Sequence, residues 1–278
     1  MSRLLAEQHP DLAGELRLVS DGWDNQLYRL GEDLAVRIPR REVAAQLIEH
    51  EQRMLPAIAA RVHVPVPVPL RMGVPSAAFP WPWSVVEWFE GVDGASVDGA
   101  DRAGIAEPLA EFVGELTVPA PDAPRNPVRG VPLASRHDVV RERLRSLSGR
   151  MEVAGLEQAW REALDAPPWD GPPLLLHGDL HPGNLLLTAD AEGGLAAVLD
   201  FGDVTSGDPA TDLATAWLTF EGDARERFRR TLPVPPDAAT WRRARGWAVV
   251  MASALATASD DNPRMASLAR HALTQLAT

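Results

Sequence analysis

The chain has 278 residues, of which 45% are hydrophobic and 24% are charged, the balance of a globular protein long enough to form two lobes around a cleft. A formal net charge of −12 argues against a nucleic-acid-binding surface, which needs clustered positive charge, and would favour a cationic small molecule as partner. The absence of cysteine excludes disulfides and thiolate metal sites. No apolar run has the length of a membrane span or of a signal peptide. We expect a monomeric, cytoplasmic protein with neither nucleic acid nor membrane as a partner.

The first ninety residues are predicted to form a small β-rich lobe. Strand-like runs, separated by turn residues, cover 16–19, 26–30, 34–38 and 83–89. A helix is predicted over residues 41–58, where apolar side chains recur at approximately helical spacing. The proline-studded segment 64–69 predicts an extended connector, because proline disrupts an interior strand. The chain then passes through a predicted hinge near residues 87–91.

The remainder of the chain is predicted to be mainly helical. The expected helices cover residues 102–117, 136–165, 209–221, 223–231, 239–259 and 263–276. A proline-rich surface loop is expected over residues 119–132. The predicted fold class is therefore α+β, with an N-lobe over residues 1–90 and a C-lobe over residues 91–278.

A loop between two apolar runs carries the strongest chemical signal, because Asp179 is followed five positions later by Asn184. Gly178 and Pro182 prevent a regular helix there, so these side chains lie on a shaped loop. A further apolar run ends at Asp200, which opens an Asp-Phe-Gly sequence. The arrangement resembles the catalytic loop and metal-binding Asp-Phe-Gly of kinases. We predict Asp179 as the catalytic residue and Asn184 and Asp200 as Mg²⁺ ligands; the alternative is a polar turn without catalytic function.

Two histidines in the same loop, His177 and His181, raise the alternative of a zinc site. Two histidines four residues apart chelate zinc when they lie on one face of a helix. Because the glycine and proline residues exclude a helix, we expect His177 to pack beneath the loop and His181 to lie near the phosphates.

The predicted nucleotide-binding residues follow from the strand over residues 34–38. Alternation along a strand puts Ala35 and Arg37 on one face, where Ala35 would lie under the base and Arg37 would bind phosphate. Lysine is absent from the chain, so a phosphate-binding cation must be arginine, whose planar group can bind phosphate bidentately. Glu51, on the following helix, is the predicted partner of Arg37, with Glu49 as the weaker candidate. The alternative is that Arg37 is a surface residue of an edge strand, and that Glu51 and Glu49 belong to a solvent-exposed helix face, without any role in nucleotide binding.

Three further nucleotide contacts are expected from the backbone. Amide groups near Ser20 would contact phosphate, although a plain hairpin turn over residues 20–25 explains this segment equally well. At the hinge, the backbone of Glu87 and of Phe89 would pair with the purine edge.

Past the Asp-Phe-Gly sequence, Asp208 is predicted as a helix N-cap and Asp212 as an anchor of the catalytic loop.

Together these segments resemble the aminoglycoside phosphotransferase family, whose fold is the bilobal protein-kinase-like one. The resemblance lies in His177-Gly178-Asp179, Asn184, Asp200-Phe201-Gly202, Asp208-Pro209, Asp212-Leu213-Ala214, Gly22-Trp23-Asp24-Asn25 and 34–40. It implies Mg²⁺-dependent transfer of the γ-phosphate of ATP or GTP to a hydroxyl of a small molecule, commonly an aminoglycoside antibiotic. The last two segments resemble a subgroup shared with macrolide kinases, in which arginine replaces lysine.

Several acceptors and two other protein classes are alternatives. An aminoglycoside-type acceptor is favoured, and a macrolide is second because nine tryptophans could form an apolar pocket. Relatives also phosphorylate choline, homoserine and sugars. A non-catalytic nucleotide-binding module is disfavoured by the intact Asp179, Asn184 and Asp200. A protein kinase is disfavoured by the short segment after Asp200, which leaves little room for an activation loop.

Overall fold

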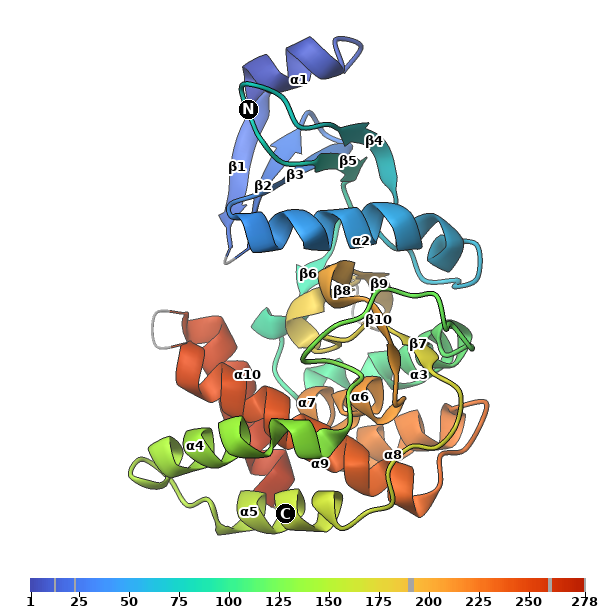
Figure 1. Ribbon diagram of the computed structural model, residues 1–278, viewed down its shortest axis with the longest axis vertical. Coiled ribbons are helices and arrows are strands. Elements are labelled where there is room, and N and C mark those ends of the chain that lie inside the picture. Colours follow the sequence, from blue (N-terminus) through green and yellow to red (C-terminus); the bar gives the residue numbers. More distant parts are fainter. Residues whose placement is uncertain (13, 23, 190–192, 260–261, 278) are drawn as a thin grey trace.

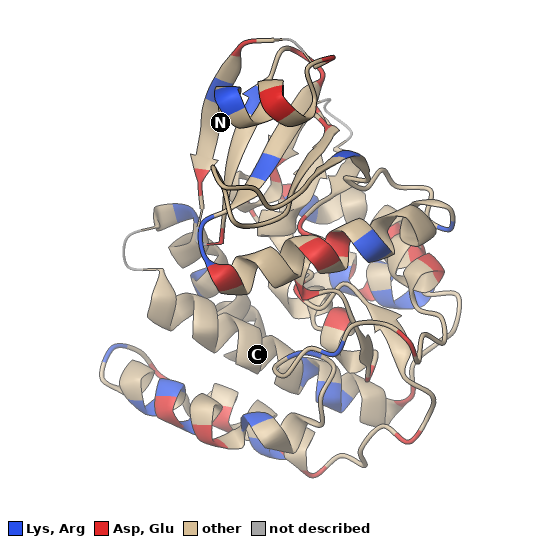
Figure 2. Ribbon diagram, turned by 45° about the horizontal axis from the view of Figure 1, so that its top comes forward, with Lys and Arg blue, Asp and Glu red and all other residues tan. Residues whose placement is uncertain are grey.

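A computed structural model describes residues 1–12, 14–22, 24–189, 193–259 and 262–277 of the chain. A β-sheet with two helices lies at one end of the molecule, and a larger, mainly helical region lies at the other (Figure 1). Trp23, part of one motif quoted above, lies outside the described residues. Acidic and basic residues are mixed over both regions (Figure 2). Within the described residues no helix is both long and apolar enough to cross a membrane.

The N-terminal region contains a five-stranded antiparallel sheet with strand order β1-β2-β3-β5-β4. Its strands are β1 (Leu16–Asp21), β2 (Asn25–Leu30), β3 (Leu34–Pro39), β4 (Pro69–Gly73) and β5 (Trp83–Glu87). Four of them match the predicted runs. β4 was not predicted, because the segment before it reads as a connector. It lies at the edge of the sheet, a position that tolerates its initial proline, which has no N–H to donate.

Two helices accompany this sheet. The unpredicted α1 (Ser2–Gln8) buries Leu4 and Leu5 in a small core with the strand residues Val36 and Val85. The predicted helix over 41–58 is confirmed as α2 (Glu42–Ala59), which runs between the sheet and the helical region (Figure 1). Its last turns belong to the large core of the helical region. The helix therefore packs against both the sheet and the helical region.

In the helical region, two of the predicted helices are each divided into two shorter helices. Its helices are α3 (Ala106–Leu116), α4 (His137–Ser148), α5 (Ala154–Leu164), α6 (Ala210–Leu213), α7 (Thr215–Thr219), α8 (Gly222–Thr231), α9 (Ala238–Ala258) and α10 (Pro263–Ala277). The helix expected over 136–165 is wrong as a single element, because the chain turns at Gly149. The one expected over 209–221 is likewise divided at Ala214. The long α9 is buried along much of its length, with Trp247 fully enclosed.

Two small antiparallel sheets hold the loops that matter for chemistry. β7 (Leu174–Leu176) pairs with β10 (Thr205–Gly207). β8 (Leu185–Leu187) pairs with β9 (Leu195–Val198), and β6 (Val92–Asp93) pairs with β8. The loop from His177 to Asn184 connects β7 to β8, and Asp200 follows the end of β9. The pairing of β8 with β9 thus brings Asn184 and Asp200, which are sixteen positions apart in the sequence, to the same end of this sheet.

Candidate active site

The backbone of the loop over residues 177–184 is fixed by a close approach and by two hydrogen bonds. Gly178 has φ of +88°, and a Cβ at this position would lie 2.3 Å from the carbonyl oxygen of Asp203. Only glycine fits this turn without strain. Asp212 accepts hydrogen bonds from the amides of His177 at 2.7 Å and of Gly178 at 2.9 Å. Asp212 therefore anchors the loop, as predicted.

The two loop histidines serve different partners. His177 is fully buried, accepts a hydrogen bond from the Asp179 amide through Nδ1 at 3.2 Å, and lies 2.9 Å through Nε2 from the carbonyl oxygen of Leu199. The Nδ1 atom of His181 accepts a hydrogen bond from the Gly183 amide at 3.0 Å. Its Nε2 atom lies 3.4 Å from Asp179 Oδ2. The two rings are thus engaged separately, and this geometry does not favour the zinc alternative.

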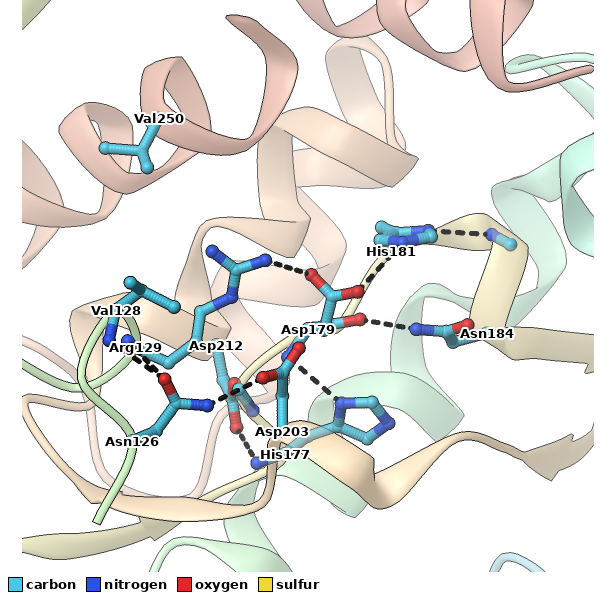
Figure 3. Close-up of polar contacts among 12 residues, drawn as sticks. Asn126, Val128, Arg129, His177, Asp179, His181, Asn184, Asp203, Asp212 and Val250 are labelled. Carbon is cyan, nitrogen blue, oxygen red and sulfur yellow. Dashed lines mark hydrogen bonds and ion pairs between the residues drawn. The ribbon is translucent and has the colours of Figure 1, made fainter. Parts of the chain in front are cut away.

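Asp179 lies at the centre of a polar cluster (Figure 3). Arg129 donates to its Oδ1 atom at 2.7 Å, and the amide group of Asn184 donates to its carbonyl oxygen at 2.8 Å. Burial by itself would raise the pKa of Asp179. The charges of Arg129 and His181 outweigh burial and hold that pKa well below its usual range. The carboxylate is therefore ionised throughout the physiological pH range.

Arg129 is the residue of this cluster that sequence reasoning missed. It lies in the segment predicted as a proline-rich surface loop, and that loop lies beside the cluster with the Arg129 side chain reaching Asp179 (Figure 3). The side chain of Asn126 accepts hydrogen bonds from the amides of Val128 at 2.9 Å and Arg129 at 3.1 Å, and donates to Asp203 at 2.6 Å. The Asn-Pro and Arg-Gly pairs signal a structured turn. No sequence signal indicates which residue the turn contacts.

The predicted metal ligands are brought together by the pairing of β8 and β9. The amide of Leu199 donates to the carbonyl oxygen of Asn184 at 2.8 Å, which places Asp200 beside Asn184. The Nδ2 atom of Asn184 is used by Asp179, so its Oδ1 atom is the group that can ligate a metal. Asp200 has the left-handed φ of 60°, a conformation that costs energy and is common at functional sites. One carboxylate and one amide oxygen, completed by phosphate oxygens and water, fit the preference of Mg²⁺.

Arg37 connects the sheet to this site. Its Nη1 atom lies 3.0 Å from Glu51 of α2, and its Nη2 atom lies 3.0 Å from Asp200. Arg37 and Glu51 are buried, whereas Glu49 is exposed, so the structure supports the pairing of Arg37 with Glu51. Burial would lower the pKa of Arg37, but the charges of Glu51 and Asp200 outweigh it and raise that pKa. Arg37 is therefore a permanent cation between the sheet and the predicted metal site.

Glu51 should make the stability of the protein depend on pH. Burial raises the pKa of Glu51 from 4.5 to about 7, against the opposing effect of Arg37. A folded-state pKa above the unfolded value means that the folded state binds the extra proton. The contribution of Glu51 to stability is therefore fully present below pH 4.5 and is lost as the pH rises through about 7. Above that pH the contribution stays constant.

The test compares the wild type with Glu51→Gln in urea denaturation at several pH values. The wild type should lose free energy of unfolding relative to the variant as the pH rises from 4.5 to about 7. The comparison cancels other titrating groups, including Asp203 and Asp212, whose pKa values burial also raises. Parallel curves for the two proteins would show that Glu51 is ionised across this range.

The other predicted nucleotide-binding residues lie on the sheet or at its end. Ala35 is buried in β3 opposite Val86. The amide of Trp88 donates to the carbonyl oxygen of Asp33 at 2.7 Å, so the flanking backbone groups of Glu87 and Phe89 face the other way. Ser20 is an exposed residue of β1, which continues to Asp21 and makes the following turn shorter than predicted. Their contacts with a nucleotide remain predictions.

Comparison with known proteins places this architecture among the kinase-like phosphotransferases. The model of the phosphotransferase enzyme family matches residues 15–247, and the chain belongs to that family. The resemblance stated from the motifs and the α+β, kinase-like fold are thereby confirmed. No curated protein sequence matches the chain.

Solved structures of antibiotic phosphotransferases share the fold. A GDP complex of an aminoglycoside 2'-phosphotransferase-IIIa mutant is 18% identical, with a TM-score of 0.74 over 99% of this chain and 95% of that chain. The GDP and kanamycin complex of APH(2")-IIIa is 17% identical, with a TM-score of 0.69 over 99% and 97%. Macrolide 2'-phosphotransferase MphH from Brachybacterium faecium is 23% identical, with a TM-score of 0.65 over 97% and 95%. At these identities the likeness concerns the fold alone.

Proposed function

We propose that the protein transfers the γ-phosphate of ATP or GTP to a hydroxyl group of a small molecule. The observation that carries this proposal is the ion-paired bridge from Arg37 to Glu51 and Asp200, beside a loop that presents Asp179. It joins a strand suited to hold phosphates to residues suited to hold Mg²⁺ and a hydroxyl. The nucleotides bound in structural neighbours, GDP and ATP, support a nucleotide donor.

In this proposal Asp179 orients the acceptor hydroxyl and takes its proton. The hydroxyl oxygen forms a bond to the γ-phosphorus, the bond from that phosphorus to the bridging oxygen breaks, and the nucleoside diphosphate leaves. Because Arg129 and His181 keep Asp179 ionised, the carboxylate holds the proton only briefly before solvent takes it. Mg²⁺ at Asn184 and Asp200 would neutralise charge on the phosphates when bound. The N-lobe, residues 1–90, would hold the nucleotide, and the C-lobe, residues 91–278, the acceptor.

Arg37→Ala should raise the nucleotide KM at least as clearly as it lowers kcat. Contacts with the phosphates exist already in the ground state, and a charged hydrogen bond contributes roughly 1.5–3 kcal/mol, or about ten- to a hundredfold in KM. Steady-state kinetics with varied ATP and GTP measure the effect. Arg37→Lys, which keeps a cation beside Glu51, should be milder than Arg37→Ala.

Arg40→Ala is the matched control for Arg37→Ala. Arg40 lies three residues further along, is exposed, and donates to the carbonyl oxygen of Gly22 at 2.7 Å. Its removal should leave the nucleotide KM nearly unchanged. An unchanged KM in Arg37→Ala together with a raised KM in Arg40→Ala would move the phosphate-binding cation to Arg40.

The acceptor is tested by a coupled phosphorylation screen over aminoglycosides, macrolides and small hydroxyl compounds, with both ATP and GTP. The aminoglycoside-type acceptor rests on the motif resemblance and on neighbours that bind kanamycin, gentamicin or streptomycin. A macrolide or a choline-, homoserine- or sugar-like metabolite is the alternative. Transfer that requires Asp179 supports the proposed function. Binding of nucleotide without transfer to any acceptor would support a non-catalytic module instead.

A further inference from the structure

Three arginines follow one another over residues 129–143, and the first of them contacts Asp179. Arg129 contacts Asp179 directly, Arg136 ends the short turn Leu133–Arg136, and Arg143 lies on α4. Arg136 and Arg143 are seven residues apart, which places them on the same side of the helix and about 10 Å apart along its axis. All three are only partly exposed to solvent. We call Arg129, Arg136 and Arg143 the arginine track.

Few of the hydrogen-bond donors of the arginine track have an acceptor among the residues that the structure describes. The side chain of Arg136 forms no hydrogen bond or ion pair with any residue that the structure describes, and its buried Nε atom has no partner. Arg129 uses one Nη atom for Asp179, while its own buried Nε atom is also without a partner. Arg143 donates from Nη1 to the carbonyl oxygen of Val250 in α9, at the long distance of 3.4 Å. Because a guanidinium group carries five N–H donors, most of the donors of these three side chains form no hydrogen bond with the residues that the structure describes.

The charge around the arginine track is positive at its outer end, at Arg136 and Arg143. At its inner end the carboxylates of Asp179, Asp203 and Asp212 face Arg129 and raise its pKa, so acidic groups balance the positive charge there. No acidic group faces Arg136 among the described residues. Burial lowers the pKa of Arg136, and the charge of Arg129 lowers it further.

Arg143 is in a similar position at the outer end of the track. Burial and the charges of Arg136 and Arg129 lower its pKa, and the exposed Glu142 is the acidic residue that opposes them. Neighbouring cations that are partly buried repel one another, and an anion between them would relieve that repulsion. The outer end of the arginine track is therefore suited to a negative ligand, despite the net charge of −12 for the chain.

We propose that the acceptor carries an anionic group, a carboxylate or a phosphate ester, which Arg136 and Arg143 bind while its hydroxyl lies at Asp179. This inference rests on the proposed function and names the class of its acceptor. Arginine binds both kinds of anion bidentately. Figure 3 shows the Arg129 side chain extended toward Asp179, and in this view Val250 lies beyond the Arg129 guanidinium group from Asp179. A polycationic aminoglycoside would place ammonium groups against these guanidinium groups, which is unfavourable.

Four sugars that differ in charge test the proposal by calorimetric binding to the full chain. Glucose 6-phosphate and glucuronate are the two anionic arms, glucose is neutral, and glucosamine is cationic. The protein is first saturated with Mg²⁺ and a non-hydrolysable ATP analogue, so that the nucleotide site cannot bind the anions. At least one anionic sugar should bind about tenfold or more tightly than glucose, and glucosamine should bind most weakly. The arm that binds distinguishes phosphate from carboxylate.

The double variant Arg136→Gln/Arg143→Gln should weaken binding of the anionic sugar by about tenfold or more and leave glucose within about twofold. Arg141→Gln/Arg145→Gln is the matched control, because both residues are exposed and lie on the opposite side of α4. It should leave binding of all four sugars nearly unchanged. Thermal unfolding of each variant checks that it is folded.

Three results would overturn the proposal: tightest binding by glucosamine, anion binding that survives the double variant, or no binding by any of the sugars. The proposed function is judged separately, by Asp179-dependent transfer in the acceptor screen. Phosphorylation of an aminoglycoside with no effect of the double variant would uphold the proposed function and reject the anionic acceptor. Failure to transfer to any acceptor would reject the proposed function itself.

Discussion

Replacing Asp179 by alanine should lower kcat for phosphoryl transfer by about 10²- to 10⁴-fold, the usual contribution of a positioned general base. Binding of the nucleotide should be nearly unchanged, because Arg37 and Asp200 lie on other elements of the fold. Single-turnover transfer, together with calorimetric titration of an ATP analogue, separates the two effects. Near-normal turnover in this variant would refute the assigned mechanism.

Asp179→Ala also removes the ion-pair partner of Arg129, so stability must be measured alongside activity. Leaving a fully buried cation unpaired costs about 3–5 kcal/mol, and the cost should be smaller here because Arg129 is only partly buried and also faces Asp203 and Asp212. Asp179→Asn keeps the shape of the side chain and removes only its charge, and it should lose activity to a similar extent. Asp122→Ala, at an exposed position, is the control and should retain full activity. Loss of activity with intact thermal unfolding assigns the effect to chemistry.

The parts of the site that could be predicted are those written in local sequence. Gly178 and Pro182 mark a loop between apolar runs, and the spacing from Asp179 to Asn184 is fixed within that loop. Alternation along β3 likewise places Arg37 on a definite face, and the helical face of α2 leaves Glu51 inside and Glu49 outside. In each case a regular element or a tight turn determines where the side chain points.

The contacts that could not be predicted depend on the path of irregular segments. Arg129 lies in a proline-rich loop without periodicity, and its contact with Asp179 joins residues 50 positions apart. The breaks at Gly149 and Ala214 were also missed, because helical periodicity continues on both sides of each turn. The net charge favours a cationic partner, yet Arg136 and Arg143 have arginine neighbours whose positive charge lowers their pKa. Overall composition therefore does not report the local field at a site.

Arg243→Ala should lower the free energy of unfolding by about 3–5 kcal/mol, because it leaves a buried carboxylate without its partner. Asp208 was predicted only as a helix N-cap, and it does accept a hydrogen bond from the Ala210 amide at 3.0 Å. Its carboxylate is also held by Arg243 of α9 through two hydrogen bonds, of 2.6 and 3.2 Å. The exposed fractions of the two side chains are 5% for Arg243 and 7% for Asp208. Urea denaturation measures the loss.

Arg242→Ala is the matched control, since its side chain is exposed one position earlier in α9, and it should cost less than about 0.5 kcal/mol. The double variant Arg243→Ala/Asp208→Ala should be more stable than the sum of the two single changes predicts, because no unpaired charge is left. Additive losses would mean that the pair is not coupled.

Asp208 precedes the helix that carries Asp212, and Asp212 holds the backbone of the catalytic loop. Loss of Arg243 should therefore lower kcat as well as stability, although Arg243 touches none of the residues assigned to catalysis.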